Sequence, residues 1–248
     1  MTFPVLLQIG SLRLNPHPLF ETLGYSLGYA TYNRARKQSD FLSEGTRWVL
    51  LAAAALGALI GSRLMAWIAD PGNFQGASWS QILEAKTVVG GLIGGTLAVE
   101  FYKPRMGITQ RTGDPLAPAL ALGIGIGRWG CFLTGLSDHT YGNPSSLAWA
   151  IDMGDGIPRH PTALYESLFC LSLAWLLIKL KNHIQREGDL FRIFMLSYFS
   201  WRFLVEFIKP GPSWYGLNAY QWASLAVILA YAPDAIRMLR FRRVSDAR

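Results

Sequence analysis

The sequence predicts an all-α polytopic membrane protein, a single domain over residues 1–248 with seven transmembrane helices. Only 16% of the 248 residues are charged and 51% are hydrophobic, whereas soluble domains carry about 25% charged residues. A helix needs about 20 apolar residues to cross a bilayer core, and seven stretches approach that length. They are residues 17–33, 47–69, 84–102, 115–135, 162–180, 190–209 and 217–236.

The seven stretches differ in strength. Residues 47–69 and 162–180 are the clearest spans, whereas 17–33 is the weakest because it contains Glu21 and has two prolines at its start. The N-terminus lacks a basic segment followed by a long apolar run, so we expect no signal peptide. Both cysteines fall in apolar runs, which argues against a disulfide framework.

Basic residues gather in alternate loops and indicate the orientation of the helices. Cytoplasmic loops carry an excess of Lys and Arg, so we expect the N-terminus outside and the C-terminus in the cytoplasm. This bias accounts for the net charge of +7, and no nucleic-acid partner is expected. The basic residues on the cytoplasmic side are Arg34, Arg36, Lys37, Arg47, Lys103, Arg105, Arg111, Lys179, Lys181, Arg186, Arg237, Arg240, Arg242, Arg243 and Arg248.

Three arginines, Arg63, Arg128 and Arg202, lie well inside predicted spans. Arginine at the bilayer centre costs at least about 2.5–3.5 kcal/mol, so it should face a partner or a wet cavity. Counted from helix starts near 115 and 190, Arg128 and Arg202 both lie roughly 18–20 Å above the cytoplasmic edge. Two guanidinium groups at one level favour an anion site. The alternative is a pair of structural salt bridges, in which Glu206, one turn beyond Arg202, neutralises it.

Glycines are concentrated in two predicted spans. The segment GIGIGRWG (123–130) contains G-x-G-x-x-G, but it lacks the strand and βαβ context of a dinucleotide site, so no dinucleotide is expected. The spacing of small residues instead predicts close helix–helix contacts at Gly90, Gly91, Gly94, Gly95, Gly123 and Gly127.

The predicted outer segment 136–161 is long and polar, and loops of more than about 12–15 residues are often functional. It contains Asp138, His139, Asp152, Asp155, Arg159 and His160. Its histidines and aspartates match no recognised ligand spacing, so neither a metal nor another cofactor is expected. His160 is equally consistent with a role in starting the fifth predicted helix.

Five segments together resemble the prolipoprotein diacylglyceryl transferase family, in the same order and over most of the chain. They are KTVVGGLIGG (86–95), GRWGCFLTG (127–135), YGNP (141–144), RHPTALYE (159–166) and WRFLVEFIKP (201–210). The resemblance implies a multi-pass enzyme of the bacterial inner membrane. Its partners would be membrane lipids and a prolipoprotein acceptor peptide. Among the lipids, phosphatidylglycerol would be the substrate. It would transfer diacylglyceryl to the lipobox cysteine thiol and release glycerol phosphate.

The resemblance also implies site residues. Arg128 and Arg202 match the family's essential arginines, and a guanidinium fork suits phosphate because it pairs two donors with phosphate oxygens and keeps its charge. Other positions are expected to contribute to substrate binding. They are Tyr25, a loose match in the first predicted span, and Gly90, Gly91, Gly142, His160, Tyr165 and Glu206 within the motifs.

The chain departs from the family pattern at residues that bear on chemistry. Val89 stands where the family has a histidine proposed to deprotonate the acceptor thiol, and valine cannot accept a proton. Cys131 stands in a stretch that is usually Gly-Asn-Phe, and Asp138-His139 stand near a usual Glu-x-x-Gly. We expect His139, oriented by Asp138, to act as the replacement base, because imidazole has a pKa of about 6.5. The alternative is that His139 is an exposed loop residue.

Other functions stay open from the sequence. Val89 and the altered segment 136–161 are also consistent with a family-like enzyme that acts on another acceptor. A non-catalytic phospholipid-binding protein is a further alternative. A transporter is the weakest one, because transporters are built from repeats around a midplane site and this sequence has no internal repeat.

Overall fold

The structure of the chain is a computed structural model, which describes residues 3–37, 42–74, 78, 85–184 and 186–245. These residues form seven α-helices and four short β-strands. They divide into two compact units. The first comprises 1–38, 112–198 and 205–210, and the second comprises 39–111, 199–204 and 211–248. That all 248 residues act as a single domain stays a prediction.

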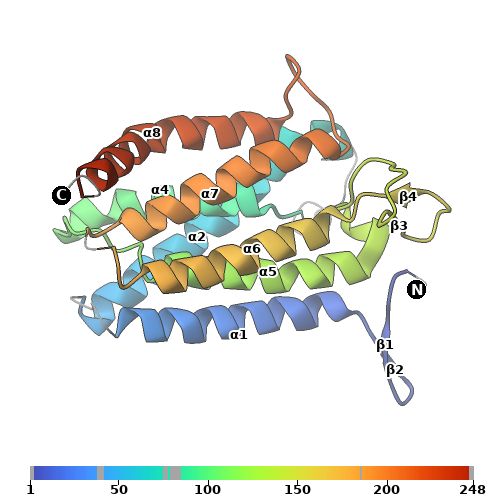
Figure 1. Ribbon diagram of the computed structural model, residues 1–248. Coiled ribbons are helices and arrows are strands. Elements are labelled where there is room, and N and C mark those ends of the chain that lie inside the picture. The colour runs from blue at the N-terminus through green and yellow to red at the C-terminus, as the bar shows by residue number, and fades with distance from the viewer. Residues whose placement is uncertain (1–2, 38–41, 75–77, 79–84, 185, 246–248) are drawn as a thin grey trace. The chain divides into compact units, whose positions relative to one another are not determined.

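The first unit is built on three neighbouring helices, α1 (Pro16–Arg36), α5 (Leu116–Thr134) and α6 (Thr162–Leu180), which lie side by side in Figure 1. Small residues let α1 and α5 approach closely. A Cβ on Gly24 would lie only 2.8 Å from the carbonyl oxygen of Gly123. Such small-residue contacts are how helices pack when no hydrophobic effect drives them together.

Most of α7 (Asp189–Val205) also belongs to the first unit. Its start is fixed by Asp114, which precedes α5. The Asp114 carboxylate accepts hydrogen bonds from the backbone N–H groups of Gly188 (2.6 Å) and Phe191 (2.9 Å). A carboxylate at this position satisfies N–H groups that have no partner within the helix.

The second unit contains α2 (Glu44–Ala69), α4 (Val88–Tyr102) and α8 (Ala219–Ser245). The helices α2 and α4 are in backbone contact, because a Cβ on Gly90 would overlap the carbonyl oxygen of Gly61. This unit therefore repeats the packing principle of the first one.

The predicted glycine contacts are confirmed at five positions. Gly123 faces α1, and the other four face α2: Gly90, Gly91, Gly94 and Gly95. The prediction is wrong at Gly127, where an added Cβ would meet no atom within 4 Å in the described part of the chain. Gly127 is therefore not required for helix packing.

The helices follow the seven predicted stretches, with differences at their ends. By length and composition, α2, α6 and the segment Leu116–Asp138 are long and apolar enough to cross a membrane. Three boundaries differ by four residues or more from those predicted. The helix α7 ends at Val205 in a 3-10 turn at Glu206–Ile208, α8 extends to Ser245, and α4 begins only at Val88.

The late start of α4 has a local cause. Thr87 caps the helix, because its hydroxyl accepts the N–H of Gly90 at 3.1 Å. The Thr87 backbone N–H donates to Ser62 Oγ on α2 at 3.2 Å. The predicted span 84–102 is therefore shortened to Val88–Tyr102, and residue 84 lies outside the described residues.

The first unit also contains four short strands, which form two antiparallel pairs. The all-α prediction did not include these strands. One pair joins β1 (Leu7–Ile9) to β2 (Leu12–Leu14), and the other joins β3 (Ile151–Asp152) to β4 (Pro158–Arg159). The N-terminal segment reaches the end of α5, where the Val5 N–H donates to the Leu133 carbonyl at 2.9 Å.

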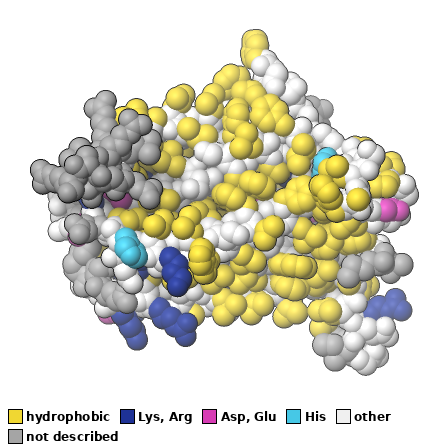
Figure 2. All heavy atoms as spheres, in the orientation of Figure 1, with side chains coloured by type: hydrophobic (Ala, Val, Ile, Leu, Met, Phe, Trp, Pro, Cys, Tyr) yellow, Lys and Arg dark blue, Asp and Glu magenta, His cyan; other side chains and the backbone are white. Residues whose placement is uncertain are grey.

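The outer surface of the first unit is apolar. Figure 2 shows hydrophobic side chains over the middle of the face formed by α1, α5 and α6, with Lys and Arg near the end of α1. Exposed apolar side chains on these helices include Leu19, Leu23, Leu27, Tyr29, Trp129, Leu168 and Trp175. Soluble monomers rarely expose contiguous apolar patches of this kind, so this face is suited to lipid.

The α2–α4 contact gives a test of the packing. We expect Gly94→Ala to lower stability by about 1–3 kcal/mol, because the new methyl group would overlap the Gly57 carbonyl oxygen. Thermal unfolding in detergent measures the change. Gly127→Ala is the matched control and should be neutral or stabilising by up to about 1 kcal/mol, since its site is open and alanine favours the helix. Equal melting temperatures for the two variants would contradict the proposed packing.

Candidate active site

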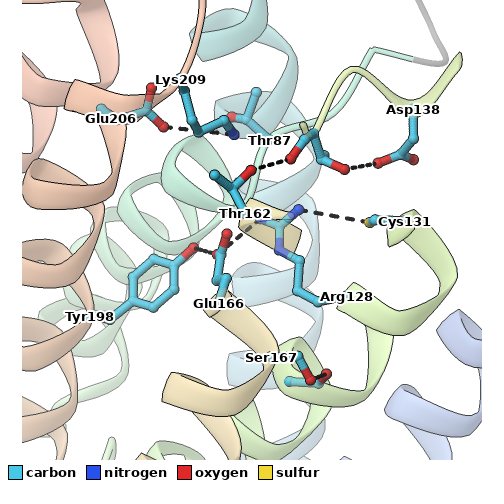
Figure 3. Close-up of polar contacts among 12 residues, drawn as sticks. Thr87, Arg128, Cys131, Asp138, Thr162, Glu166, Ser167, Tyr198, Glu206 and Lys209 are labelled. Carbon is cyan, nitrogen blue, oxygen red and sulfur yellow. Dashed lines mark hydrogen bonds and ion pairs between the residues drawn. The ribbon is translucent and has the colours of Figure 1, made fainter. Parts of the chain in front are cut away.

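The candidate site in the first unit centres on Arg128 of α5 (Figure 3). Its side chain is 11% exposed, and its Nη2 atom is 2.9 Å from Glu166 Oε1 on α6. Its Nη1 atom is 3.7 Å from Cys131 Sγ, one turn further along α5. The buried Nε atom has no hydrogen-bond partner among the described residues. The guanidinium therefore has donor capacity beyond its ion pair.

Glu166 holds Arg128 in place. Its side chain is 4% exposed, and its Oε1 atom also accepts a hydrogen bond from the hydroxyl of Tyr198 on α7 at 2.8 Å. A buried charge without a partner is strongly destabilising, so each member of the ion pair depends on the other. In the sequence, Glu166 is the last residue of the RHPTALYE segment (159–166), and no role was predicted for it. Its role as the partner of Arg128 was foreshadowed only by the rule that an arginine inside a span needs an acidic partner or a wet cavity.

Asp138 pairs with a histidine, but not with its neighbour in the sequence. Its Oδ1 atom lies 3.0 Å from His17 Nδ1, at the start of α1, and its Oδ2 atom accepts the Thr140 hydroxyl at 2.7 Å. His139 is exposed and has a left-handed backbone with φ of 54°. The expected orientation of His139 by Asp138 is therefore corrected, because the Asp138 carboxylate is directed to His17 and Thr140. A role for His139 as base stays a prediction.

The loop after Asp138 packs tightly on the start of α6. The Gly142 N–H donates to the His160 carbonyl at 2.9 Å. A Cβ on Gly142 would lie 2.7 Å from the His160 Cβ and 2.8 Å from the Ile208 carbonyl oxygen. Thr162 donates its hydroxyl to the Thr140 carbonyl. Three chain segments meet at residue 142, and they leave no room for a side chain larger than that of glycine.

His160 and Tyr165 form an aromatic contact beside this loop. The His160 Nδ1 atom is 3.4 Å from the Tyr165 hydroxyl, which accepts the Trp149 indole N–H at 2.7 Å. The Arg159 guanidinium nearby makes two hydrogen bonds to Asp155, of 2.6 and 2.7 Å, and lowers the pKa of that carboxyl. The outer loop is therefore held by side-chain contacts as well as by the pairing of β3 with β4.

Arg202 belongs to the second unit, unlike Arg128. Its side chain is buried, and its guanidinium carbon lies 5.6 Å from the centroid of the Tyr220 ring. Glu206 belongs to the first unit and has Lys209 Nζ 3.9 Å from its Oε1 atom. The roles expected for Arg202 and Glu206 in substrate binding stay predictions.

The remaining predicted positions are spread over both units. Tyr25 is 71% exposed on α1 and donates its hydroxyl to Glu21 at 2.9 Å. Gly90 and Gly91 lie on α4, in the contact with α2. Val89 on the same helix is 1% exposed, so an apolar side chain fills a buried position there.

The arrangement around Arg128 is suited to binding an anion. The guanidinium lies among apolar helices, where its attraction for an anion is stronger than in water. Glu166 and Tyr198 fix its orientation from one side, and its buried Nε–H has no hydrogen-bond partner among the described residues. Such an arrangement is able to hold a phosphodiester oxygen and to stabilise negative charge that develops on it.

Comparison with known proteins agrees with this chemistry. A family model described as prolipoprotein diacylglyceryl transferase matches residues 4–233. A phosphatidylglycerol–prolipoprotein diacylglyceryl transferase of Bordetella parapertussis is 31% identical over 246 residues, which is 92% of this chain and 92% of that protein. A protein of the same name from Finegoldia magna is 31% identical over 216 residues, covering 84% and 85% of the two chains. The chain is therefore a multi-pass membrane enzyme of the prolipoprotein diacylglyceryl transferase family, with a role in lipoprotein biosynthesis.

Proposed function

We propose that this chain transfers the diacylglyceryl group of phosphatidylglycerol to the lipobox cysteine thiol of a prolipoprotein. The acceptor sulfur forms a bond to the glyceryl carbon, and the bond from that carbon to the phosphate oxygen breaks. Glycerol phosphate leaves with the electron pair. Negative charge thus moves from sulfur to phosphate during the step.

The observation that carries this proposal is that the buried Arg128 has one N–H donor, its Nε–H, without a hydrogen-bond partner among the described residues. Two of its nitrogens contact Glu166 and Cys131, and its Nε has no partner among the described residues. The oxygen of a bound anion would accept a hydrogen bond from this N–H. Arg128 therefore holds the phosphate and stabilises the departing glycerol phosphate. The resemblance implies a second phosphate ligand, and Arg202 is our candidate for it.

Glu166 acts as a positioning residue in this scheme. With Tyr198 it fixes the guanidinium of Arg128 from one side. The fixed fork then presents its remaining donors without a loss of side-chain entropy when the lipid binds.

The proposed location is the bacterial inner membrane, with seven spans, an outer N-terminus and a cytoplasmic C-terminus. The loop charges of the sequence support this orientation. The apolar face of the first unit supports contact with lipid. Phosphatidylglycerol would then enter sideways from the outer leaflet, with the acceptor peptide approaching from the outer side.

A second candidate is the same transfer to a different acceptor. Val89, buried in α4, favours it, because the family's proposed thiol base is absent from that position. An acceptor that ionises more readily than a cysteine thiol would not need the base. The acceptor peptide is thus the variable to change if the first test gives no product.

The transfer itself is the first prediction. Purified protein with phosphatidylglycerol and a lipobox peptide should give a thioether-linked diacylglyceryl peptide, detected by mass spectrometry. We expect Arg128→Lys to lower the rate by about 10²–10³-fold, since lysine offers one point charge instead of a fork of donors.

Arg34→Lys is the matched control, because Arg34 is exposed near the end of α1. Its rate should equal that of the unchanged protein. A rate for Arg128→Lys within a few-fold of this control would remove Arg128 from the phosphate site. Absence of product from folded, lipid-loaded protein would contradict transfer to the lipobox thiol.

The ion pair supplies a prediction that separates structure from catalysis. Glu166→Met alone should lower stability by about 3–5 kcal/mol, because it leaves the buried charge of Arg128 uncompensated. The double variant Arg128→Met/Glu166→Met should recover most of that stability and remain inactive. Thermal unfolding in detergent and the transfer assay measure the two effects. An active double variant would show that the pair has only a structural role.

A further inference from the structure

We propose that His17, Cys131 and Asp138 form a binding site for a zinc ion beside Arg128, with the fourth ligand position open to the acceptor thiol. The three side chains each offer one ligand atom, and these atoms all lie within 4.8 Å of one another. The site belongs entirely to the first unit. It deepens the proposed function, on which its catalytic part rests, by supplying the activation of the thiol.

The distances are close to those of a zinc site. Zinc bonds of about 2.0–2.1 Å to nitrogen and oxygen and about 2.3 Å to sulfur place tetrahedral ligand atoms about 3.3–3.6 Å apart. His17 Nδ1 and Asp138 Oδ1 are already 3.0 Å apart. Small side-chain movements would therefore bring the three ligand atoms of His17, Cys131 and Asp138 onto one ion.

The ligands are carried by ordered elements. His17 begins α1, whose Asn15 cap accepts the His17 N–H at 2.9 Å. Cys131 lies in the last turns of α5, and Asp138 ends the 3-10 turn that follows. Gly130 lets α1 approach, because a Cβ there would lie 3.0 Å from the Cα of His17. A site on packed helix ends is largely formed before the ion binds.

The ligand types and the exposure favour zinc in a catalytic arrangement. Zinc accepts nitrogen, sulfur and carboxylate oxygen, and catalytic zinc sites combine three protein ligands with one open position. The side chains of His17 and Asp138 are 23% and 12% exposed, so neither is fully buried. The thiolate of Cys131 and the carboxylate of Asp138 together balance the charge of the ion.

A zinc ion at this site would activate the acceptor thiol without a protein base. A thiol that binds zinc is deprotonated outright, so the sulfur would reach the lipid as a thiolate.

The acceptor thiol releases its proton to water as its sulfur takes the open position on zinc. The zinc-bound thiolate then attacks the glyceryl carbon of phosphatidylglycerol, and the carbon–oxygen bond to phosphate breaks. Arg128, whose Nη1 is 3.7 Å from Cys131 Sγ, is close enough to the site to stabilise the departing phosphate. The ligand position on zinc is open again when the thioether product dissociates.

Metal content tests the site without any transfer assay. Full-length protein in detergent, loaded with zinc and dialysed, should retain one zinc per chain by elemental mass spectrometry. His17→Gln, Cys131→Ser and Asp138→Asn should each retain much less. His139→Ala and Cys170→Ser are the matched controls and should retain as much as the unchanged chain. Equal retention by all five variants, or none by the folded unchanged protein, would overturn the proposal.

Cobalt tests the open position. Co²⁺ in place of zinc should give a thiolate-to-cobalt absorption band that is lost in Cys131→Ser. A lipobox peptide should increase this band, whereas the same peptide with serine for cysteine should not. An unchanged spectrum with the cysteine peptide would overturn the role in thiol activation.

The two assays separate this inference from the proposed function. A cobalt–peptide signal without a lipidated product would retain the metal site and contradict transfer from phosphatidylglycerol. A lipidated product formed at the same rate by metal-free protein would retain the transferase and overturn the zinc step. In that case the His17–Asp138 pair would be tested next as a proton acceptor.

Discussion

The buried ion pair between Arg128 and Glu166 is the constraint on which the first unit depends. A guanidinium among apolar helices is stable only with its counter-charge, and that counter-charge comes from a different helix. Tyr198 adds a third helix to the same carboxylate. The interaction therefore fixes α5, α6 and α7 relative to one another at the depth where the anion would bind. Stability and phosphate binding are linked because both use the same guanidinium.

Helix packing supplies the second constraint. The lack of a side chain at Gly24 and Gly123 brings the backbones of α1 and α5 close together. Gly90 and Gly94 have the same effect on α4 and α2. Close packing of this kind keeps the helix ends in fixed positions. The ends of α1 and α5 carry His17 and Cys131, so their separation is set by the α1–α5 contact, including the close approach of Gly130 to His17.

Much of the architecture could be predicted from the sequence, because apolar length determines a membrane helix. The fifth expected span, 162–180, coincides with α6, and the position of Arg128 inside a span predicted its need for a partner, which is Glu166. Pairings between distant segments could not be predicted. His17 and Asp138 lie far apart in the chain, and Asp138 stands next to a histidine that is not its partner. Glu166 was missed because sequence periodicity does not tell which buried acid faces a given arginine.

The short helix α4 has a consequence for the surrounding bilayer. Its 15 residues span about 22 Å, whereas the hydrocarbon core is about 30 Å thick. Thr87 and Ser62 satisfy backbone and hydroxyl groups at its first turn, so this end tolerates a position below the headgroups. A membrane helix shorter than the hydrocarbon core is accommodated by local thinning of the bilayer, by snorkelling of flanking side chains or by oligomerisation. If α4 spans the membrane and the bilayer thins beside it, headgroups and water reach deeper there than elsewhere, and the enzyme responds to the acyl-chain length of the host membrane.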